Sequence, residues 1–129
     1  MGARKQKAAN LRKETLKSTY FAKLNNCPTS PRKMRMVADM IRGVEVARAS
    51  ALLQFTKREA AGRLNKLLRA AIDSYEHKSG ETFNAGDLIV KEVFVDEGRS
   101  LKRVQPAPQG RAHRIRKRSN HVTIILGTN

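Results

Sequence analysis

The cations near the end of this chain lie in a segment that contains no carboxylate. All 11 Asp and Glu residues lie at or before Glu97. The stretch that follows contains eight basic residues: Arg99, Lys102, Arg103, Arg111, Arg114, Arg116, Lys117 and Arg118. Its apolar residues are too few to offset the ordering entropy and the mutual repulsion of these charges. The segment therefore predicts binding to a polyanion, as does the formal net charge of +16 for the whole chain.

The kind of cation narrows the choice of polyanion. Six of the eight are Arg, whose planar fork binds a phosphate through two hydrogen bonds and stacks on exposed bases of structured RNA. A second group, Arg32, Lys33 and Arg35, follows Ser30 and Pro31, which are typical of a helix start. Cations there oppose the helix dipole, whereas a bound phosphate would meet both these side chains and the free amides. We expect phosphate contacts there too.

Other chemistry finds little support in the sequence. His77, His113 and His121 lack metal-ligand spacing. The pair Asp96-Glu97 at the end of a predicted strand is typical of a solvated corner. The single cysteine, Cys27, is expected to be a small buried side chain. The dispersed glycines match neither nucleotide-binding loop. We therefore expect neither catalysis nor a metal or cofactor.

Length and composition indicate one domain in a cytoplasmic protein. The chain has 129 residues, enough for a single core. Its start lacks the apolar run of a signal peptide, and its longest aliphatic runs, such as Leu88-Ile89-Val90, are far shorter than a membrane span. We expect no membrane partner. Residues 1–19 are predicted to be a basic arm, either mobile or helical on a partner, and residues 20–129 a single domain.

Hydrophobic spacing predicts the elements of that domain. Alternation at Tyr20, Ala22 and Leu24 indicates a strand that ends at residues 26–28. One helix is expected from Ser30 to Gly43, with Ser30 as its cap, and a second from about Glu45 to Phe55.

The third helix has the strongest pattern. Apolar residues recur at steps of three and four from Ala60 to Tyr75, and Ser79-Gly80 ends the run. We predict that Thr56 and Glu59 form a capping box at its start. A loop is expected at 84–87, followed by strands at 88–95 and 122–126.

Pairing of those last two strands would make a long hairpin of residues 98–119. At roughly 3.3 Å per residue its arms could reach on the order of 30 Å beyond the body. A loop this long is normally functional or disordered. The turn is predicted at its midpoint, where Pro106, Pro108 and Gly110 suit a reversal of the chain.

Four stretches resemble a known family. They are SPRKMRMVADMIRG at 30–43, LLRAAIDSYEH at 67–77, VFVDEGRSLKR at 93–103 and QGRAHRIRKRSNHVTI at 109–124. In this order they resemble the bacterial large-subunit ribosomal protein L-twenty-two family, from Tyr20 onward.

This resemblance implies an α+β fold in which three helices pack on a small three-stranded antiparallel sheet, with a long protruding β-hairpin. It implies a non-enzymatic protein that binds and braces large-subunit ribosomal RNA beside neighbouring large-subunit proteins. It also implies that the tip, Gln105, Pro106, Ala107, Pro108, Gln109 and Gly110, lines the nascent-peptide exit tunnel. Members often carry basic residues about the tip, whereas residues 105–109 here are uncharged.

Two other classes of protein remain as alternatives. An architectural protein on DNA or non-ribosomal RNA fits the composition, but no helix has a basic face with base-reading Asn or Gln. A cationic membrane-active protein would need a basic amphipathic helix with bulky apolar residues opposite, and the strongest helix has a mostly Ala and Leu face.

Overall fold

The structure is a computed structural model that describes residues 2–80, 82, 86 and 88–128. Within these residues there are four helices, α1 (Ala3–Ser18), α2 (Pro31–Ile41), α3 (Val46–Phe55) and α4 (Glu59–Ser79). The strands are β1 (Tyr20–Cys27), β2 (Leu88–Glu97), β3 (Leu101–Pro106), β4 (Ala112–Lys117) and β5 (Asn120–Thr128). The loop predicted at 84–87 lies almost wholly outside the described residues.

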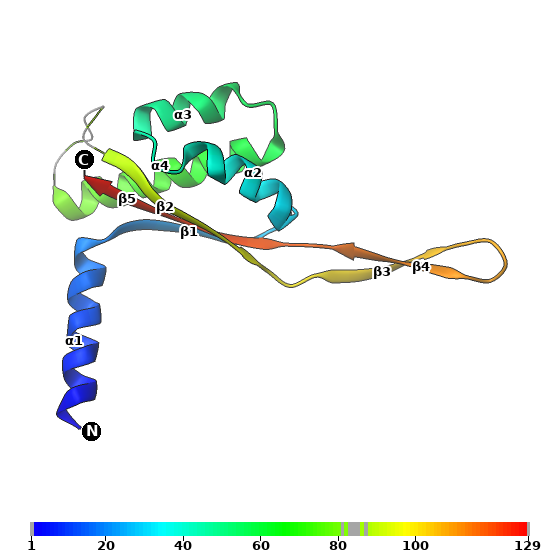
Figure 1. Ribbon diagram of the computed structural model, residues 1–129, viewed down its shortest axis with the longest axis horizontal. Coiled ribbons are helices and arrows are strands. Elements are labelled where there is room, and N and C mark those ends of the chain that lie inside the picture. The colour runs from blue at the N-terminus through cyan, green and yellow to red at the C-terminus, as the bar shows by residue number, and fades with distance from the viewer. Residues whose placement is uncertain (1, 81, 83–85, 87, 129) are drawn as a thin grey trace.

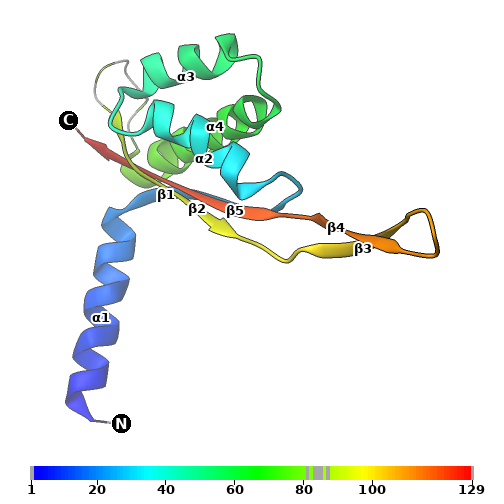
Figure 2. The same ribbon diagram turned by 45° about the vertical axis from the view of Figure 1, so that its right-hand side comes forward.

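The body has two layers. Strands β1, β5 and β2 form an antiparallel sheet in that order, and α2, α3 and α4 cover one face of it (Figures 1 and 2). The α+β class and the three-stranded sheet are therefore confirmed. The number of helices is corrected from three to four, because residues 3–18 form α1, which buries no side chain and projects away from the body (Figure 1).

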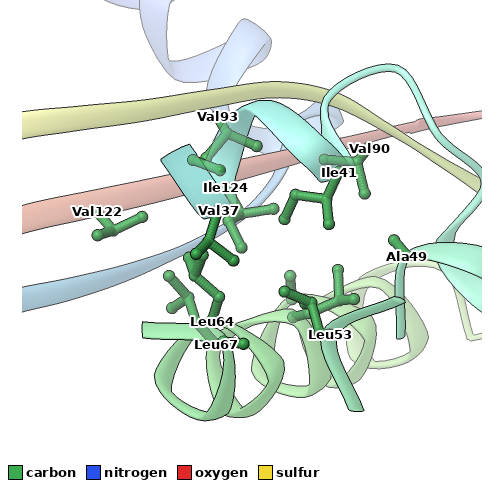
Figure 3. Close-up of a cluster of buried hydrophobic side chains, with 14 of the residues drawn as sticks. Val37, Ile41, Ala49, Leu53, Leu64, Leu67, Val90, Val93, Val122 and Ile124 are labelled. Atoms are coloured by element: carbon green, nitrogen blue, oxygen red, sulfur yellow. The ribbon is translucent and has the colours of Figure 1, made fainter. Parts of the chain in front are cut away.

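The core lies between the sheet and its three covering helices. Val122, Ile124 and Leu126 alternate with half-exposed residues along the central strand β5, as their spacing predicted. Val37 and Ile41 of α2, with Leu64 of α4, point at this row (Figure 3). Cys27 is buried at 2% exposure, which confirms its predicted place in the core.

The capping box predicted at Thr56 and Glu59 is wrong. Thr56 ends α3 instead of starting α4, because both its amide and its hydroxyl donate to the Leu52 carbonyl, at 3.1 and 2.7 Å. The cap of α4 is Arg58, and the Glu59 carboxylate pairs with Arg63 at 2.7 Å instead of reaching back. Ser30 does occupy the cap position of α2, but its hydroxyl makes no capping hydrogen bond.

The hairpin has the predicted limits. The ladder between β2 and β5 ends at the pair Glu97 and Asn120, so residues 98–119 leave the body together. They form a second, two-stranded sheet of β3 and β4 that continues beyond the body (Figure 1).

Candidate nucleic-acid interface

The hairpin presents cations on both of its faces. Every residue of β3 and β4 is exposed. Residues directly opposite each other in an antiparallel pair share a face, and successive residues alternate. Lys102 therefore shares one face with its partner Arg116, while Lys117, opposite Leu101, lies on the other face. Arg103 also lies on this second face, and Arg114 on the first.

These charges have no compensating acid among the described residues. In the described part of the chain the ion pairs are Arg42 with Asp39 and Arg63 with Glu59, so no hairpin cation is paired with an acid. Like charges directly opposite in a ladder, as at Lys102 and Arg116, destabilise it. Anions on either face would remove this repulsion, so the hairpin is suited to lie between phosphates.

Two hydrogen bonds close the root of the hairpin, the place where residues 98–99 and 117–119 leave the body side by side. The Gly98 amide donates to the Ser119 carbonyl at 2.9 Å, and the Ser119 hydroxyl donates to the Arg99 carbonyl at 2.7 Å. A Cβ atom at Gly98 would lie only 2.5 Å from the Ser119 Oγ. A larger residue here would push the Ser119 hydroxyl out of its bond to Arg99 and crowd the Ser119 carbonyl carbon at 3.2 Å, so glycine suits the close approach of the two chains where the hairpin leaves the body.

Side chains of β5 bind the β1–α2 connection to this root. The buried Asn120 amide donates to both the carbonyl and the hydroxyl oxygens of Thr29, each at 2.7 Å. His121 Nδ1 accepts a hydrogen bond from the backbone N–H of Asn26, near the end of β1, at 3.0 Å. These contacts hold the start of α2 beside the hairpin, so the two predicted cationic groups meet there.

Two hollows mark this meeting point. One, of about 390 Å³, is lined by Ser30, Pro31, Arg32, Arg35, Glu97 and Arg118. The other, of about 560 Å³, is lined by Asn26, Pro28, Ser30, Arg99, Leu101, Lys117, Arg118 and Ser119. Arg118 belongs to both. Arginines from two segments far apart in sequence thus surround a space beside the start of a helix, where a phosphate could accept hydrogen bonds from side chains and backbone amides.

Most of the residues predicted to bind RNA lie either at the root of the hairpin or along its arms. Six line the hollows at the root: Ser30, Arg32, Arg35, Arg99, Lys117 and Arg118. Lys102, Arg103, Arg114 and Arg116 lie outward along the arms and Arg111 at the turn, while Lys33 is exposed on α2 without lining either hollow.

Arg35 has a structural role that the sequence did not reveal. Its Nε and one terminal nitrogen donate to the Val95 carbonyl at 3.3 and 3.1 Å. Arg42 donates through a single terminal nitrogen to the Val93 carbonyl at 2.9 Å. Both arginines join α2 to β2, so Arg35 both lines the hollow and holds the helix in place.

The tip is a compact, uncharged turn. The Ala107 amide donates to the Arg111 carbonyl at 2.8 Å, which places the reversal within the predicted stretch. Gln109 and Gly110 both have left-handed backbone, with φ of 62° and 70°. This conformation suits glycine but is strained for Gln109.

The first helix adds a further basic surface. It has a single acid, Glu14, and the cations Arg4, Lys5, Lys7, Arg12, Lys13 and Lys17. Lys78 of α4 donates to the carbonyls of Leu16 and Thr19, at 3.3 and 2.7 Å. A cation at the C-terminal end of a helix is favourable, so Lys78 holds this end of α1 to the body.

The described residues form neither a metal site nor a membrane-spanning helix. Among the described residues, no three His, Cys, Asp or Glu side chains gather as a metal site would require. No helix in that part of the chain is both long and apolar enough to cross a membrane. Asp96 and Glu97 are both exposed, in keeping with a solvated corner.

Sequence reasoning missed the residues that build the root, namely Gly98, Ser119, Asn120, His121 and Asn26. For His121 the sequence indicated only that it lacks the spacing of a metal ligand. The signal present was a glycine at the start of the hairpin and an asparagine directly after its end, but their contacts and those of His121 depend on residues up to 95 positions away.

Comparison with known proteins decides the family. The model of a family described as ribosomal protein L22p/L17e matches residues 22–127. The chain belongs to this family. It is therefore a structural ribosomal protein and not an enzyme, and the resemblance inferred from the four motifs is confirmed.

Curated relatives match almost the whole chain. The chain is 60% identical over 99% of its length to the large ribosomal subunit protein uL22 of Bacteroides fragilis, of which it covers 94%. It is 60% identical over 98% of its length to the protein of the same name from Flavobacterium johnsoniae, covering 93% of that protein. It is 58% identical over 99% of its length to the relative of this name from Porphyromonas gingivalis, and it covers 96% of that protein.

Proposed function

We propose that this protein binds and braces large-subunit ribosomal RNA, as a structural constituent of the large ribosomal subunit in the cytoplasm. One observation carries the proposal. The hairpin leaves the body with cations on both faces, and no acid of the described residues pairs with them. The names of the relatives support the choice of the large subunit.

In this proposal the hairpin cations neutralise RNA phosphates, while the root holds the hairpin in a fixed direction. Cations on the two faces of β3 and β4 allow two RNA segments to approach each other, which their phosphates would otherwise oppose. The root, where Asn120 holds Thr29, fixes the direction of the hairpin relative to the body. Residues 1–19 act as a basic arm of the same protein, and residues 20–129 as its single domain.

The tip has a different role in this proposal. Gln105 to Gly110 carry no charge, so they contribute little to RNA affinity. Their place at the far end of the hairpin (Figure 1), together with the family resemblance, supports a role in which the turn forms part of the wall of the nascent-peptide exit tunnel. The passing nascent peptide and neighbouring ribosomal proteins are then its contacts there.

Gradient sedimentation of a cell lysate tests the proposal. Stoichiometric cofractionation with the large subunit, persisting through a high-salt wash, is the expected result. A free pool at the top of the gradient, or recovery with DNA or membranes, would favour the alternative classes and contradict this function.

A further inference from the structure

Phe55, at the end of α3, is the most exposed large hydrophobic side chain among the described residues. It is 86% exposed, against 49% for Phe94 on the sheet. Fully burying a Phe side chain is worth about 1.5–3 kcal/mol, so leaving this ring in water forgoes a large stabilisation. A single exposed apolar residue is ordinary by itself. Its surroundings are what give Phe55 significance.

The backbone beside Phe55 is held firmly. Thr56 is fixed by two hydrogen bonds to Leu52, and Leu53 is buried in the core. Arg58 then caps α4. The ring therefore stands on a rigid corner between two packed helices, and a contact made by Phe55 costs little backbone entropy.

This corner is also strongly cationic. Lys57 and Arg58 lie two and three residues after Phe55 and are exposed, and neither is in an ion pair of the described structure. The nearest acid in sequence, Glu59, is paired with Arg63 at 2.7 Å. Beside them lies a hollow of about 430 Å³, lined by Leu53, Gln54, Thr56, Lys57, Arg58, Glu59, Gly62 and Asn65.

Asn65 adds an unused polar group to this wall. Its Oδ1 atom is buried and accepts no hydrogen bond from the described residues. A rotation of the amide would present an acceptor or a donor to a partner in the hollow. Ribose hydroxyls and base amino groups of RNA can serve such a group.

We propose that the α3–α4 corner, residues 55–58, is a second RNA-binding surface on which an unpaired base stacks on Phe55 while Lys57 and Arg58 contact the flanking phosphates. Charge complementarity favours RNA over a protein partner, because an apolar protein pocket would have to desolvate the two adjacent cations. The partner's identity rests on the proposed function above. The corner lies in the helical layer, whereas the hairpin leaves from the sheet layer (Figures 1 and 2), so RNA would hold the body from two directions.

Binding of the full chain to deproteinised large-subunit ribosomal RNA, measured across a salt series, tests this surface. Phe55→Ala should weaken binding about 5- to 150-fold, the range for loss of one base–aromatic stack, without changing the salt dependence. Phe55→Trp should retain parental affinity. The double variant Lys57→Gln with Arg58→Gln should instead flatten the log–log salt slope by about 1.4 to 1.8.

Phe94→Ala is the matched control. This exposed ring lies on the open face of the sheet, between the acids Glu92 and Asp96 on the same face of β2, so RNA should contact it less than Phe55 and the variant should bind like the parent. Equal losses for Phe55→Ala and Phe94→Ala would overturn the proposal. All variants must first show the parental melting temperature.

The outcomes separate this inference from the proposed function. If Phe55→Ala binds like the parent while Arg114→Ala, Arg116→Ala and Arg118→Ala together weaken binding, the corner is not an RNA surface and the hairpin still is. If Phe55→Ala binds RNA normally but fails to enter large subunits, the ring contacts a protein, which also overturns the inference. If the parent itself shows no preference for ribosomal RNA, the proposed function fails first.

Discussion

Replacement of Arg114, Arg116 and Arg118 by Ala tests whether the hairpin binds RNA through its positive charges. All three side chains are exposed and lie outside the β1–β5–β2 sheet, and none is in an ion pair of the described structure. Their loss should leave the melting temperature of the body close to that of the parent. It should weaken binding to ribosomal RNA strongly, because each arginine removed gives up one phosphate contact.

The magnitude follows from the number of cations. Eight contacts give a log–log salt slope of about −5.6 on single-stranded RNA to −7.2 on a duplex, and removing three flattens it by about 2 to 3. Between about 50 and 200 mM salt the parent hairpin should lose about two-thousand- to twenty-thousand-fold in affinity, and the variant about a hundred- to five-hundred-fold. Filter binding or fluorescence anisotropy over this salt range gives both slopes.

A charge-matched control separates position from total charge. Arg48, Arg69 and Lys91 are exposed cations of the body that line neither hollow at the root. Changing all three to Ala removes the same charge and should leave the slope much closer to the parent's. An unchanged slope in the hairpin variant, or equal flattening in both triple variants, would refute a specific role for the hairpin arginines.

Four further predictions concern the body, the root, the arms and the tip. Leu68, fully buried in α4, should cost about 2–5 kcal/mol of unfolding free energy when changed to Ala; a loss well below 1 kcal/mol in urea denaturation would mean that this face of α4 is not packed. Arg35→Ala should lower both RNA affinity and body stability, the latter by about 1 kcal/mol through its bonds to β2, whereas Arg32→Ala should lower affinity alone; equal melting curves for the two variants would contradict this. Amides of β3 and β4 should exchange hydrogen much faster than those of β5 in free protein, because an isolated two-stranded ladder is marginal in water; equal protection in the two sheets would show that the hairpin is stable alone. Deleting Ala107, Pro108 and Gln109 should leave RNA affinity and assembly nearly intact but alter macrolide action or nascent-peptide stalling; failed assembly, or ribosomes that behave like the parent in both assays, would refute the role of the tip.

Some of this architecture could be predicted because its causes are local in sequence. Alternation at Val122, Ile124 and Leu126 indicates a central strand whatever lies around it, and the long run of α4 indicates a helix. The limits of the hairpin follow from the same logic, since the acid-free segment begins where the apolar alternation of β2 ends. The predicted cations at Arg32 and Arg118 were placed in separate elements, and the fold brought them to one hollow.

The parts that the sequence left open or predicted wrongly depend on competition between local structures or on distant contacts. Thr56 could have started one helix or ended another, and the local pattern cannot decide which carbonyl its hydroxyl meets. The sequence around Arg35 indicates only an exposed cation, because its hydrogen-bond partner, the Val95 carbonyl of β2, lies 60 positions away. Residues 1–19 have no apolar face to bury, so the sequence left a mobile arm and a helix formed on a partner equally open, and the structure has a helix attached through Lys78.

A cryo-electron microscopy map of large subunits purified from cells that express this chain would test the central claim most directly. We expect full occupancy, with β3 and β4 enclosed by ribosomal RNA on both faces, phosphates beside Arg32 and Arg118 at the root, and the turn at residues 106–110 on the wall of the exit tunnel. Subunits that lack the chain, or that hold the body while the hairpin extends into solvent, would contradict it.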